Sequence, residues 1–464
     1  MIIYYPVLVV SFFIIGLLIR INRFVFHRLA KNSVGLVDGL ISATEEDEKI
    51  KEVQQKTNGL VAALLKMFLV IIIAFAAGSI PIIIYALATG TSYAELDFSS
   101  FYAILFLSLG ATIPFIIPLG KKKESSYSEL SQLLHRMALD NYNISNRLFK
   151  RERKKIRKKG FNEKPDFVIV SGLARAGTTS LMNDLSEVDG FVSLNYANMP
   201  FLMAPNTWRK FYKPKTEKLK ERSHKDGIMI GYNSNEALEE YFFKVKADDA
   251  FIKPDHLTEY AITGETYNDY LDYQNIIKLD DKKTYLAKNN NFILRYKSMR
   301  EFNDEFIMVL MFRDPLTHAA SLMEKHLEYQ KLQKEDPFVL EYMNWLGHHE
   351  FGLNQKPFVF SEHAYYNQYD KTSLNYWLKN WIYYYQYILK IDHPNTLLIN
   401  YDDYCKNPGS VVETVLQKTK ISADIPDYNA FNNSRKTNRE YDKNLYEEAQ
   451  QVYSKLIDKA SNIK

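Results

Sequence analysis

Three long segments without charged residues dominate the hydrophobic pattern at the start of the chain. They are Met1–Ile19, Met67–Ala88 and Phe101–Leu119. Each approaches the ~20 apolar residues that a helix needs to cross the hydrocarbon core of a bilayer. Pro81 and Pro114 lie inside the later segments, where membrane helices accommodate proline as a kink. The pattern predicts a membrane module at residues 1–123 with about three transmembrane helices, of which the last two form a hairpin.

The first apolar segment has a second interpretation as a cleaved signal peptide. No basic region precedes it, and no small-residue cleavage site lies before Arg20. We therefore favour a retained transmembrane helix.

Basic residues predict the orientation of this module. They are frequent in the predicted loop from Arg20 to Thr57, absent from the hairpin tip Thr89–Ser100, and present again at Lys121–Lys123. Short loops rich in Lys and Arg stay on the cytoplasmic side of a membrane. The rest of the chain is therefore expected in the cytoplasm, as in a multi-pass protein of a bacterial inner membrane.

A strongly basic stretch follows the last apolar segment. In Lys150–Lys159, "KRERKKIRKK", eight of the ten residues are basic. Beside a bilayer, anionic headgroups stabilise each such charge by roughly 1 kcal/mol, so residues 124–163 are interpreted as a juxtamembrane linker on the membrane surface. A solvated linker is the alternative. Nucleic acid is not expected as a partner, because no aromatic residues are interleaved with the charges and the net charge is only +4.

From residue 164 to 464 the pattern changes to short apolar runs alternating with helical segments. Phe167–Ser171, Ile307–Phe312 and Thr396–Tyr401 are rich in β-formers and suit strands buried on both faces. This alternation predicts a P-loop-like, three-layer α/β domain with a central parallel sheet. Tyr376–Tyr387 is expected to be a helix whose aromatic residues pack on that sheet, with a carbohydrate-stacking surface as the alternative.

Composition agrees with an ordered protein, since 46% of the residues are hydrophobic and 25% are charged. The single cysteine, Cys405, excludes an internal disulfide and fits a reducing compartment. We expect its thiol to be a small buried group.

The stretch Ser171–Ser180, "SGLARAGTTS", carries the clearest chemical signal. Gly172 and Gly177 bracket four residues between a predicted strand and a predicted helix, which is the arrangement of an anion-binding loop. Thr178 stands where a triphosphate-binding loop has its lysine, and Arg175 inside the loop offers a planar fork for an oxyanion. The loop is therefore predicted to hold a phosphate without a metal bridge.

This stretch resembles the 5′-phosphosulfate-binding loop of sulfotransferases that use 3′-phosphoadenosine 5′-phosphosulfate (PAPS). Ala174 and Ala176 replace the proline and serine that are usual in that family. A second stretch of the chain, "VLMFRDPLTHAASL", resembles another motif of the family. In it, Arg313 lies at the end of a predicted strand and Ser321 follows eight residues later. The resemblance extends to "YLAKNN" at Tyr285–Asn290 and to "LLINYDDYCKNP", so it covers roughly residues 165–408.

The resemblance implies transfer of a sulfuryl group from PAPS to a hydroxyl or amine, with no metal required. Arg313 and Ser321 would hold the nucleotide 3′-phosphate, and Lys288 would place a cation on the bridging oxygen. Nucleotide-binding residues implied in this way are Gly172, Arg175, Ala176, Gly177, Thr178, Thr179, Ser180, Arg313 and Ser321. The acceptor is expected to be a glycan, a lipid or a lipid-linked sugar, because the domain is predicted to lie at the membrane.

A base that takes the acceptor's proton is harder to assign, because the segment after the first helix lacks the expected acid at Asn195. Four candidates lie downstream, namely His224, Glu236, Glu239 and Glu240. His224 lies in a polar loop and is preferred over Glu236, which begins an apparent helix where an acid is also favoured by the dipole.

Further polar clusters remain hypotheses. The late basic segment Ser434–Lys436 is a candidate to close over the nucleotide, or an exposed tail. His326, His348 and His349 lack the spacing of a metal site. Two other functions compete: a P-loop kinase or NTPase without its lysine, which would need an acidic residue to hold magnesium, and a catalytically inactive membrane-anchored nucleotide-binding protein.

Overall fold

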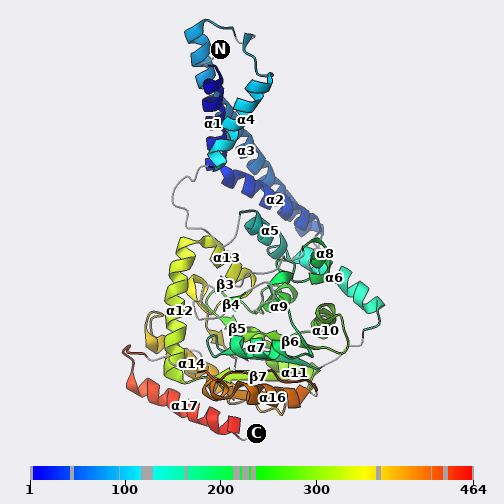
Figure 1. Cartoon of the computed structure of the whole chain (residues 1–464). Coiled ribbons are helices and arrows are strands. Elements are labelled where there is room, and N and C mark those ends of the chain that lie inside the picture. Colours follow the sequence, from blue (N-terminus) through cyan, green and yellow to red (C-terminus); the bar gives the residue numbers. More distant parts are fainter. Residues whose placement is uncertain are drawn as a thin grey trace. The chain divides into compact units, whose positions relative to one another are not determined.

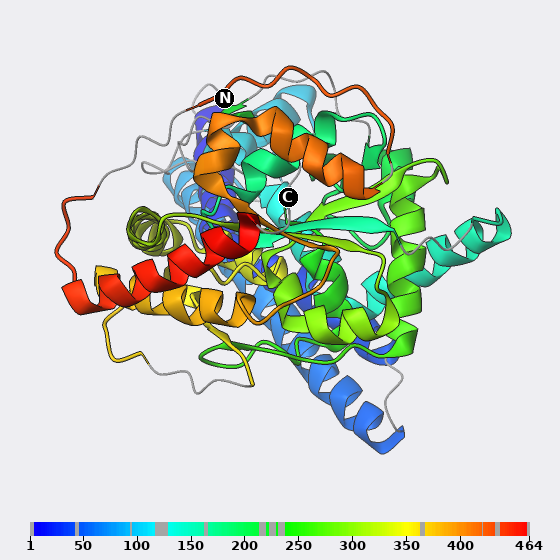
Figure 2. The same cartoon turned by 90° about the horizontal axis from the view of Figure 1, so that it is seen from below.

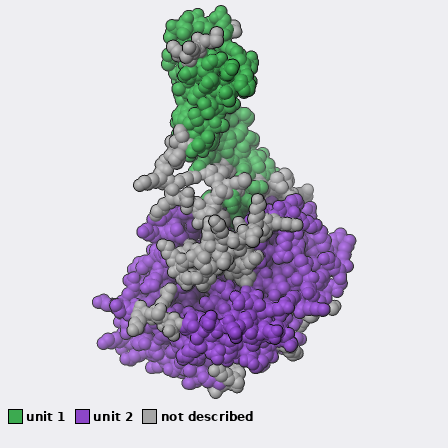
Figure 3. Space-filling model, viewed as in Figure 1, with its two compact units in different colours: residues 1–143 green, residues 144–464 purple. Residues whose placement is uncertain are grey.

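The computed structural model describes residues 4–41, 46–92, 95–116, 129–161, 166–212, 220–221, 229–230, 237–361, 367–419, 421–431 and 437–461. The chain divides into two units, Met1–Asn143 and Ile144–Lys464 (Figure 3). The boundary differs from both boundaries that the sequence suggested for the linker, at 123 and 163.

The first unit is helical. Its helices are α1 (Tyr4–Ile21), α2 (Arg23–Ile41), α3 (Glu46–Thr89), α4 (Phe101–Ile116) and α5 (Glu129–Leu139), and α1 packs against both α3 and α4. Gly16 of α1 faces the backbone of Ala111 so closely that a Cβ would lie 2.7 Å from its carbonyl oxygen. Gly110 approaches Val9 in the same way. Small residues allow this close approach of helices, as they do in membrane bundles.

The helices of the first unit differ partly from the expected loops and spans. Two of them, Tyr4–Ile21 and Val53–Thr89, are long and apolar enough to cross a bilayer, and α4 is apolar but shorter. The prediction of a loop from Arg20 to Thr57 is wrong, because α2 and the start of α3 occupy most of these residues. Large apolar side chains are exposed on α3 and α4, among them Phe68, Leu69, Ile72, Phe75, Ile84, Leu87, Phe101, Ile104, Leu109 and Phe115.

A five-stranded parallel sheet forms the centre of the second unit. The strands lie in the order β2 (Phe191–Val192), β6 (Thr284–Lys288), β1 (Phe167–Gly172), β7 (Ile307–Phe312) and β9 (Thr396–Asn400). In register, Val170 pairs with Lys288 on one side and with Val309 on the other. The expected strands and the parallel α/β class are confirmed, except that the last strand ends at Asn400 and Tyr401 begins a helix.

Helices cover both faces of this sheet, as Figure 2 shows for the sides carrying α16 and α17. On one face, α7 (Thr178–Glu187) and α16 (Pro408–Thr419) pack on Val168, Val170 and Val309. On the other face, α10 (Gly264–Lys278) contacts β6 and α17 (Lys443–Ser461) contacts β9. The aromatic helix α14 (Leu374–Ile388) packs against α12 and α17, and most of its aromatic side chains are buried, as expected.

The remaining elements complete the second unit (Figure 1). They are α6 (Tyr142–Lys158), α8 (Pro205–Phe211), α9 (Glu240–Ala247), α11 (Tyr296–Phe302), α12 (Pro315–Glu335), α13 (Pro337–Trp345), α15 (Tyr401–Lys406), β3 (Lys220–Glu221), β4 (Met229–Ile230), β5 (Leu257–Thr258) and β8 (Phe358–Val359).

The basic stretch at Lys150–Lys159 lies almost entirely in α6, an amphipathic helix of the second unit. Phe149 and Ile156 are buried, and Arg157 binds Asp272 of α10 with an N–O distance of 2.6 Å. Arg153 forms an ion pair with Asp269 of the same helix. The other basic side chains of the stretch are exposed: Lys150, Arg151, Lys154, Lys155, Lys158 and Lys159. Part of the positive charge therefore holds α6 on the domain.

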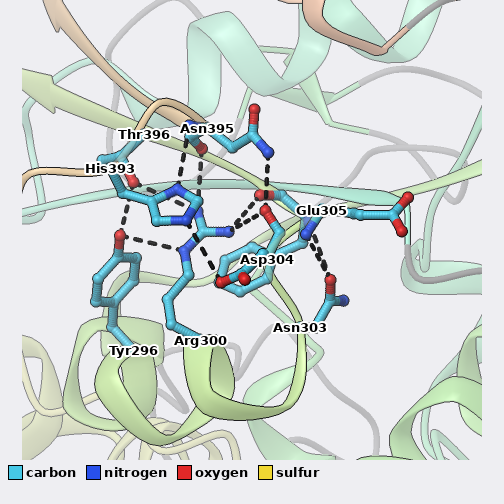
Figure 4. Close-up of polar contacts among 9 residues, drawn as sticks. Tyr296, Arg300, Asn303, Asp304, Glu305, His393, Asn395 and Thr396 are labelled. Atoms are coloured by element: carbon cyan, nitrogen blue, oxygen red, sulfur yellow. Dashed lines mark hydrogen bonds and ion pairs between the residues drawn. The ribbon is translucent and has the colours of Figure 1, made fainter.

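At the amino ends of β7 and β9, Arg300 of α11 joins several chain segments (Figure 4). Its guanidinium donates to the carbonyl oxygens of Phe306 at 2.8 Å, Asn395 at 3.0 Å and Asp304 at 3.2 Å. It also donates to the Thr396 hydroxyl at 3.3 Å. Carbonyl partners satisfy this half-buried charge, so the arginine stabilises the amino edge of the sheet.

Candidate functional site

The loop between β1 and α7 begins and ends at glycines that the fold requires. Gly172 has φ +149°, and a Cβ there would lie 2.6 Å from the carbonyl oxygen of Met311. Gly177 has φ +98°, and a Cβ there would overlap the Tyr401 ring. Arg175 between them also adopts a left-handed conformation, with φ 70°. Such a backbone in a residue other than glycine is uncommon and concentrates at functional sites.

His318 of α12 holds this loop in place by a hydrogen bond, called here the brace of the loop. The indole N–H of Trp381 donates to His318 Nδ1 at 3.1 Å, which leaves the Nε2–H to donate to the Ala174 carbonyl at 2.8 Å. His318 is completely buried, and this burial lowers its pKa to about 3. The imidazole is therefore neutral, and it ties the loop to α12 and α14 without adding charge.

Two cationic side chains, one from β6 and one from the loop itself, form hydrogen bonds at the loop. Lys288, the last residue of β6, donates to the Thr179 hydroxyl of α7 at 2.9 Å. Arg175 Nε donates to the Ser321 hydroxyl of α12 at 3.3 Å. The structure thus brings together four residues that the sequence had connected only by resemblance.

Arg313 reaches the same edge of the sheet through Tyr401. Its guanidinium lies over the Tyr401 ring at 4.8 Å from the centroid, and the same ring blocks any side chain at Gly177. Burial raises the pKa of Tyr401 to about 12, so this hydroxyl stays neutral. Tyr401 is a contact residue that sequence reasoning missed, although it is the last residue of a predicted strand, and ligands gather at the carboxyl ends of strands.

Asp314, the acid beside Arg313, has a structural task. Its carboxylate accepts from the Thr317 N–H at 2.9 Å and from the Thr317 hydroxyl at 2.9 Å, and so caps α12. Capping of this kind stabilises a helix N-terminus. Among the described residues, no group of acids and histidines has the arrangement of a metal site.

Two adjacent acids near β6 have different environments. Glu240 is buried and binds Arg295 through two hydrogen bonds, at 2.6 Å and 2.8 Å. Glu239 is also buried and accepts from the Tyr285 hydroxyl at 3.1 Å and from Asn289 Nδ2 at 3.2 Å. Burial raises the pKa of Glu239 to about 7. Neither acid lies on the loop, but Asn289, which hydrogen-bonds to Glu239, directly follows Lys288.

His224, Glu236 and Ser434–Lys436 lie outside the described residues.

The three histidines considered for a metal have separate partners. His326 Nδ1 accepts from the Gly352 N–H at 3.2 Å. His348 Nε2 and His349 Nδ1 face the carbonyl oxygens of Ala237 and Asn354 at 3.1 and 3.0 Å. These contacts give each ring a structural role.

Comparison with known proteins finds similarity in structure. No protein-family model and no curated protein matches the chain. A sulfotransferase from Mycobacterium tuberculosis matches with a TM-score of 0.37 and 12% identity, covering 72% of this chain and 82% of that one. A sulfotransferase from Mycobacterium avium matches with a TM-score of 0.37 and 11% identity, covering 80% and 85%. One from Alicyclobacillus acidocaldarius has a TM-score of 0.29 and 14% identity, covering 64% and 94%. Similarity this distant leaves the chemistry to be argued from the residues of this chain.

Proposed function

We propose that this protein is a sulfotransferase that moves a sulfuryl group from PAPS to an acceptor held near the cytoplasmic face of a membrane. The observation that carries the proposal is the convergence of Arg175, Lys288, Thr179 and Ser321 on one glycine loop. Each is a donor for anionic oxygen. Lys288, Thr179 and Ser321 come from β6, α7 and α12, and Arg175 lies in the loop itself.

The loop suits the 5′-phosphosulfate of the donor. Backbone N–H groups from Ala174 onward and the N-terminus of α7 favour a bound anion. Arg175 and Thr178 add side-chain donors, and Lys288 supplies a cation for the oxygen that bridges phosphorus and sulfur. When the bond from sulfur to that oxygen breaks, negative charge develops there, and a preorganised cation stabilises it.

The 3′-phosphate is assigned to Arg313 and Ser321. Both residues are buried, at the end of β7 and on the second turn of α12. A guanidinium fork and a hydroxyl suit a terminal phosphate.

The kinase or NTPase alternative is weaker on this geometry. It requires a lysine at position 178 and an acid that holds magnesium. Thr178 occupies the first position, and the carboxylate of Asp314 caps a helix.

Anchoring to a membrane is part of the same proposal. The apolar lengths of α1 and α3, the exposed apolar side chains of α3 and α4, and the glycine-mediated packing of α1 support it. The exposed lysines of α6 support a position close to anionic headgroups. Export-dependent reporters fused after Lys464 and at the tip between α3 and α4 test the orientation, and activity at Lys464 would overturn it.

Thermal stabilisation by nucleotides tests the function itself. Adenosine 3′,5′-bisphosphate, the product of sulfuryl transfer, should stabilise the protein by about 2.7 kcal/mol at a concentration of 100 times its Kd. ATP with magnesium should stabilise it much less. Stabilisation by ATP with magnesium alone would overturn the proposal.

A further inference from the structure

A pocket opens directly beside the loop. It holds about 460 Å³ of empty space, part of it open to solvent, and its wall includes Leu173 and Ala174 of the loop. Leu322, the residue after Ser321, lies on another wall. A molecule in this pocket would therefore adjoin the site proposed for the donor, as the second substrate of a transfer reaction must.

The walls of this pocket are largely apolar and aromatic. Phe358, Trp377, Tyr383 and Tyr384 line it together with Leu322. These side chains offer an acceptor flat apolar contacts, which favour aromatic or alkyl groups.

The polar groups of Trp377 and Tyr383 already have partners inside the protein. The Trp377 indole N–H donates to the Lys371 carbonyl at 2.8 Å, and the Tyr383 hydroxyl exchanges hydrogen bonds with the backbone of Phe360. The side-chain oxygen of Gln355 accepts from Tyr376 at 3.1 Å. A sugar would bury several hydroxyls against these walls with few donors to match them, which is unfavourable. The pocket therefore suits an apolar group with one hydroxyl.

Glu350 brings a carboxylate to this pocket, in the segment between α13 and β8. It is half-buried, and within the described part of the chain its one hydrogen bond comes from Asn290 Nδ2, at a long 3.5 Å. Asn290 lies two residues after Lys288, and its carbonyl accepts from Ser171 of β1. Glu350 is thus placed next to the carboxyl ends of β1 and β6, where the reacting sulfur is expected.

From these contacts we infer that the acceptor is an alcohol on an apolar or aromatic group, and that Glu350 accepts its proton. The inference rests on the proposed sulfuryl transfer. As the acceptor oxygen bonds to sulfur, its proton moves to the Glu350 carboxylate. The bond between sulfur and the bridging oxygen breaks, and its electron pair leaves on adenosine 3′,5′-bisphosphate.

Acceptor choice is the first test. Full-length protein in detergent is given PAPS labelled in the sulfuryl group, with n-decanol or methyl β-glucoside as acceptor. We expect transfer to decanol to be at least about tenfold faster, since an apolar pocket discriminates by roughly that factor. Equal or faster transfer to the glucoside would overturn the acceptor class.

The Glu350→Gln variant tests the base. Transfer to decanol should fall about 100-fold, the usual contribution of a general base. Transfer to 4-nitrophenol, assayed at a pH where this phenol is ionised, needs no base and should fall less than about fivefold. Glu324→Gln, an exposed acid on α12, is the matched control and should leave both rates unchanged. A Glu350→Gln variant that keeps decanol transfer, or that loses both acceptors equally, would overturn this role.

Three further variants separate this inference from its competitors. His224→Ala and Glu236→Gln should retain transfer to decanol, and loss of transfer in either one would move the base there. Asn380→Phe narrows the pocket without changing Glu350 or the loop, and should raise the KM for decanol about tenfold. An unchanged KM would remove the acceptor from this pocket.

Nucleotide stabilisation distinguishes a failure of this inference from a failure of the proposed function. The Glu350→Gln and Asn380→Phe variants should be stabilised by adenosine 3′,5′-bisphosphate as the wild type is. Stabilisation without the predicted acceptor effects overturns only the acceptor pocket. A wild type that the bisphosphate does not stabilise overturns the sulfotransferase and the acceptor pocket together.

Discussion

The two edges of the central sheet use the same kind of residue for different purposes. At the amino edge, the guanidinium of Arg300 donates to three backbone carbonyls and also to the hydroxyls of Tyr296 and Thr396, and these acceptors compensate its charge (Figure 4). At the carboxyl edge, Arg175 and Lys288 donate to the hydroxyls of Ser321 and Thr179. A hydroxyl can turn to donate to a bound anion, whereas a carbonyl can only accept. The comparison teaches that backbone carbonyls around a cation, which cannot donate to an anion, mark a stabilising contact, whereas a cation that donates to hydroxyls can become part of a binding site.

The largest effect is expected at the carboxyl edge. Lys288→Ala removes the cation proposed for the bridging oxygen and should lower kcat about 1000-fold, as loss of one preorganised donor does. The midpoint of urea unfolding should change little, because the Thr179 hydroxyl that accepts from Lys288 is half-buried and can turn to water instead. Loss of stability with unchanged kcat would place Lys288 with the structural cations and break the comparison.

A buried acid behind the carboxyl edge should give stability a pH dependence. The pKa of Glu239 is about 7 in the folded protein, raised by burial from 4.5. Its contribution is fully present below about pH 4.5 and is lost as the pH rises through about 7, at a cost of about 3 kcal/mol.

Urea unfolding of wild type and Glu239→Gln at a series of pH values isolates this contribution. The difference in unfolding free energy between the two proteins should change in favour of the variant between about pH 5 and about pH 8. His318 acts in the opposite sense in both proteins and cancels, because its pKa is lowered and its contribution is lost on acidification. A difference that does not vary with pH would contradict the neutral state of Glu239.

A substitution at the amino edge should change the stability of the protein and leave its affinity for the nucleotide unchanged. Arg300→Ala leaves the carbonyls of Asp304, Phe306 and Asn395 without this donor, and should lower the unfolding free energy by about 2 to 3 kcal/mol. Affinity for adenosine 3′,5′-bisphosphate, measured by calorimetry under conditions where the variant is folded, should stay within about twofold. A larger loss of affinity would show that the two edges are coupled.

The smallest effect concerns the brace of the loop. His318→Ala removes the hydrogen bond to the Ala174 carbonyl and should weaken bisphosphate binding about tenfold, because the free loop then has more conformations to lose. Trp381→Phe removes only the donor to His318 Nδ1 and should have a smaller effect in the same direction. Affinities equal to the wild type in both variants would mean that the loop holds its shape without the brace.

Local sequence patterns determined much of the secondary structure of this protein. The strand, glycine loop and helix around Gly172 and Gly177 could be predicted because their conformations depend on near neighbours and on hydrophobic period. The apolar lengths of α1 and α3 could be read for the same reason. Each of the glycine loop, Lys288 and Arg313 lies at the end of a predicted strand or strand segment. Their positions therefore suggested that a parallel sheet would bring them together at its carboxyl edge.

Only the tertiary structure decided which polar groups became binding groups and which became supports. The Glu350 pocket, the brace from His318 and the Arg300 cluster join residues that are far apart in sequence, and no spacing rule relates them. Arg153 and Arg157 could be counted as part of a basic stretch, but the acids of α10 that bind them lie more than 100 residues away. Burial and partners set the protonation and the role of such groups, and both exist only once the chain has folded.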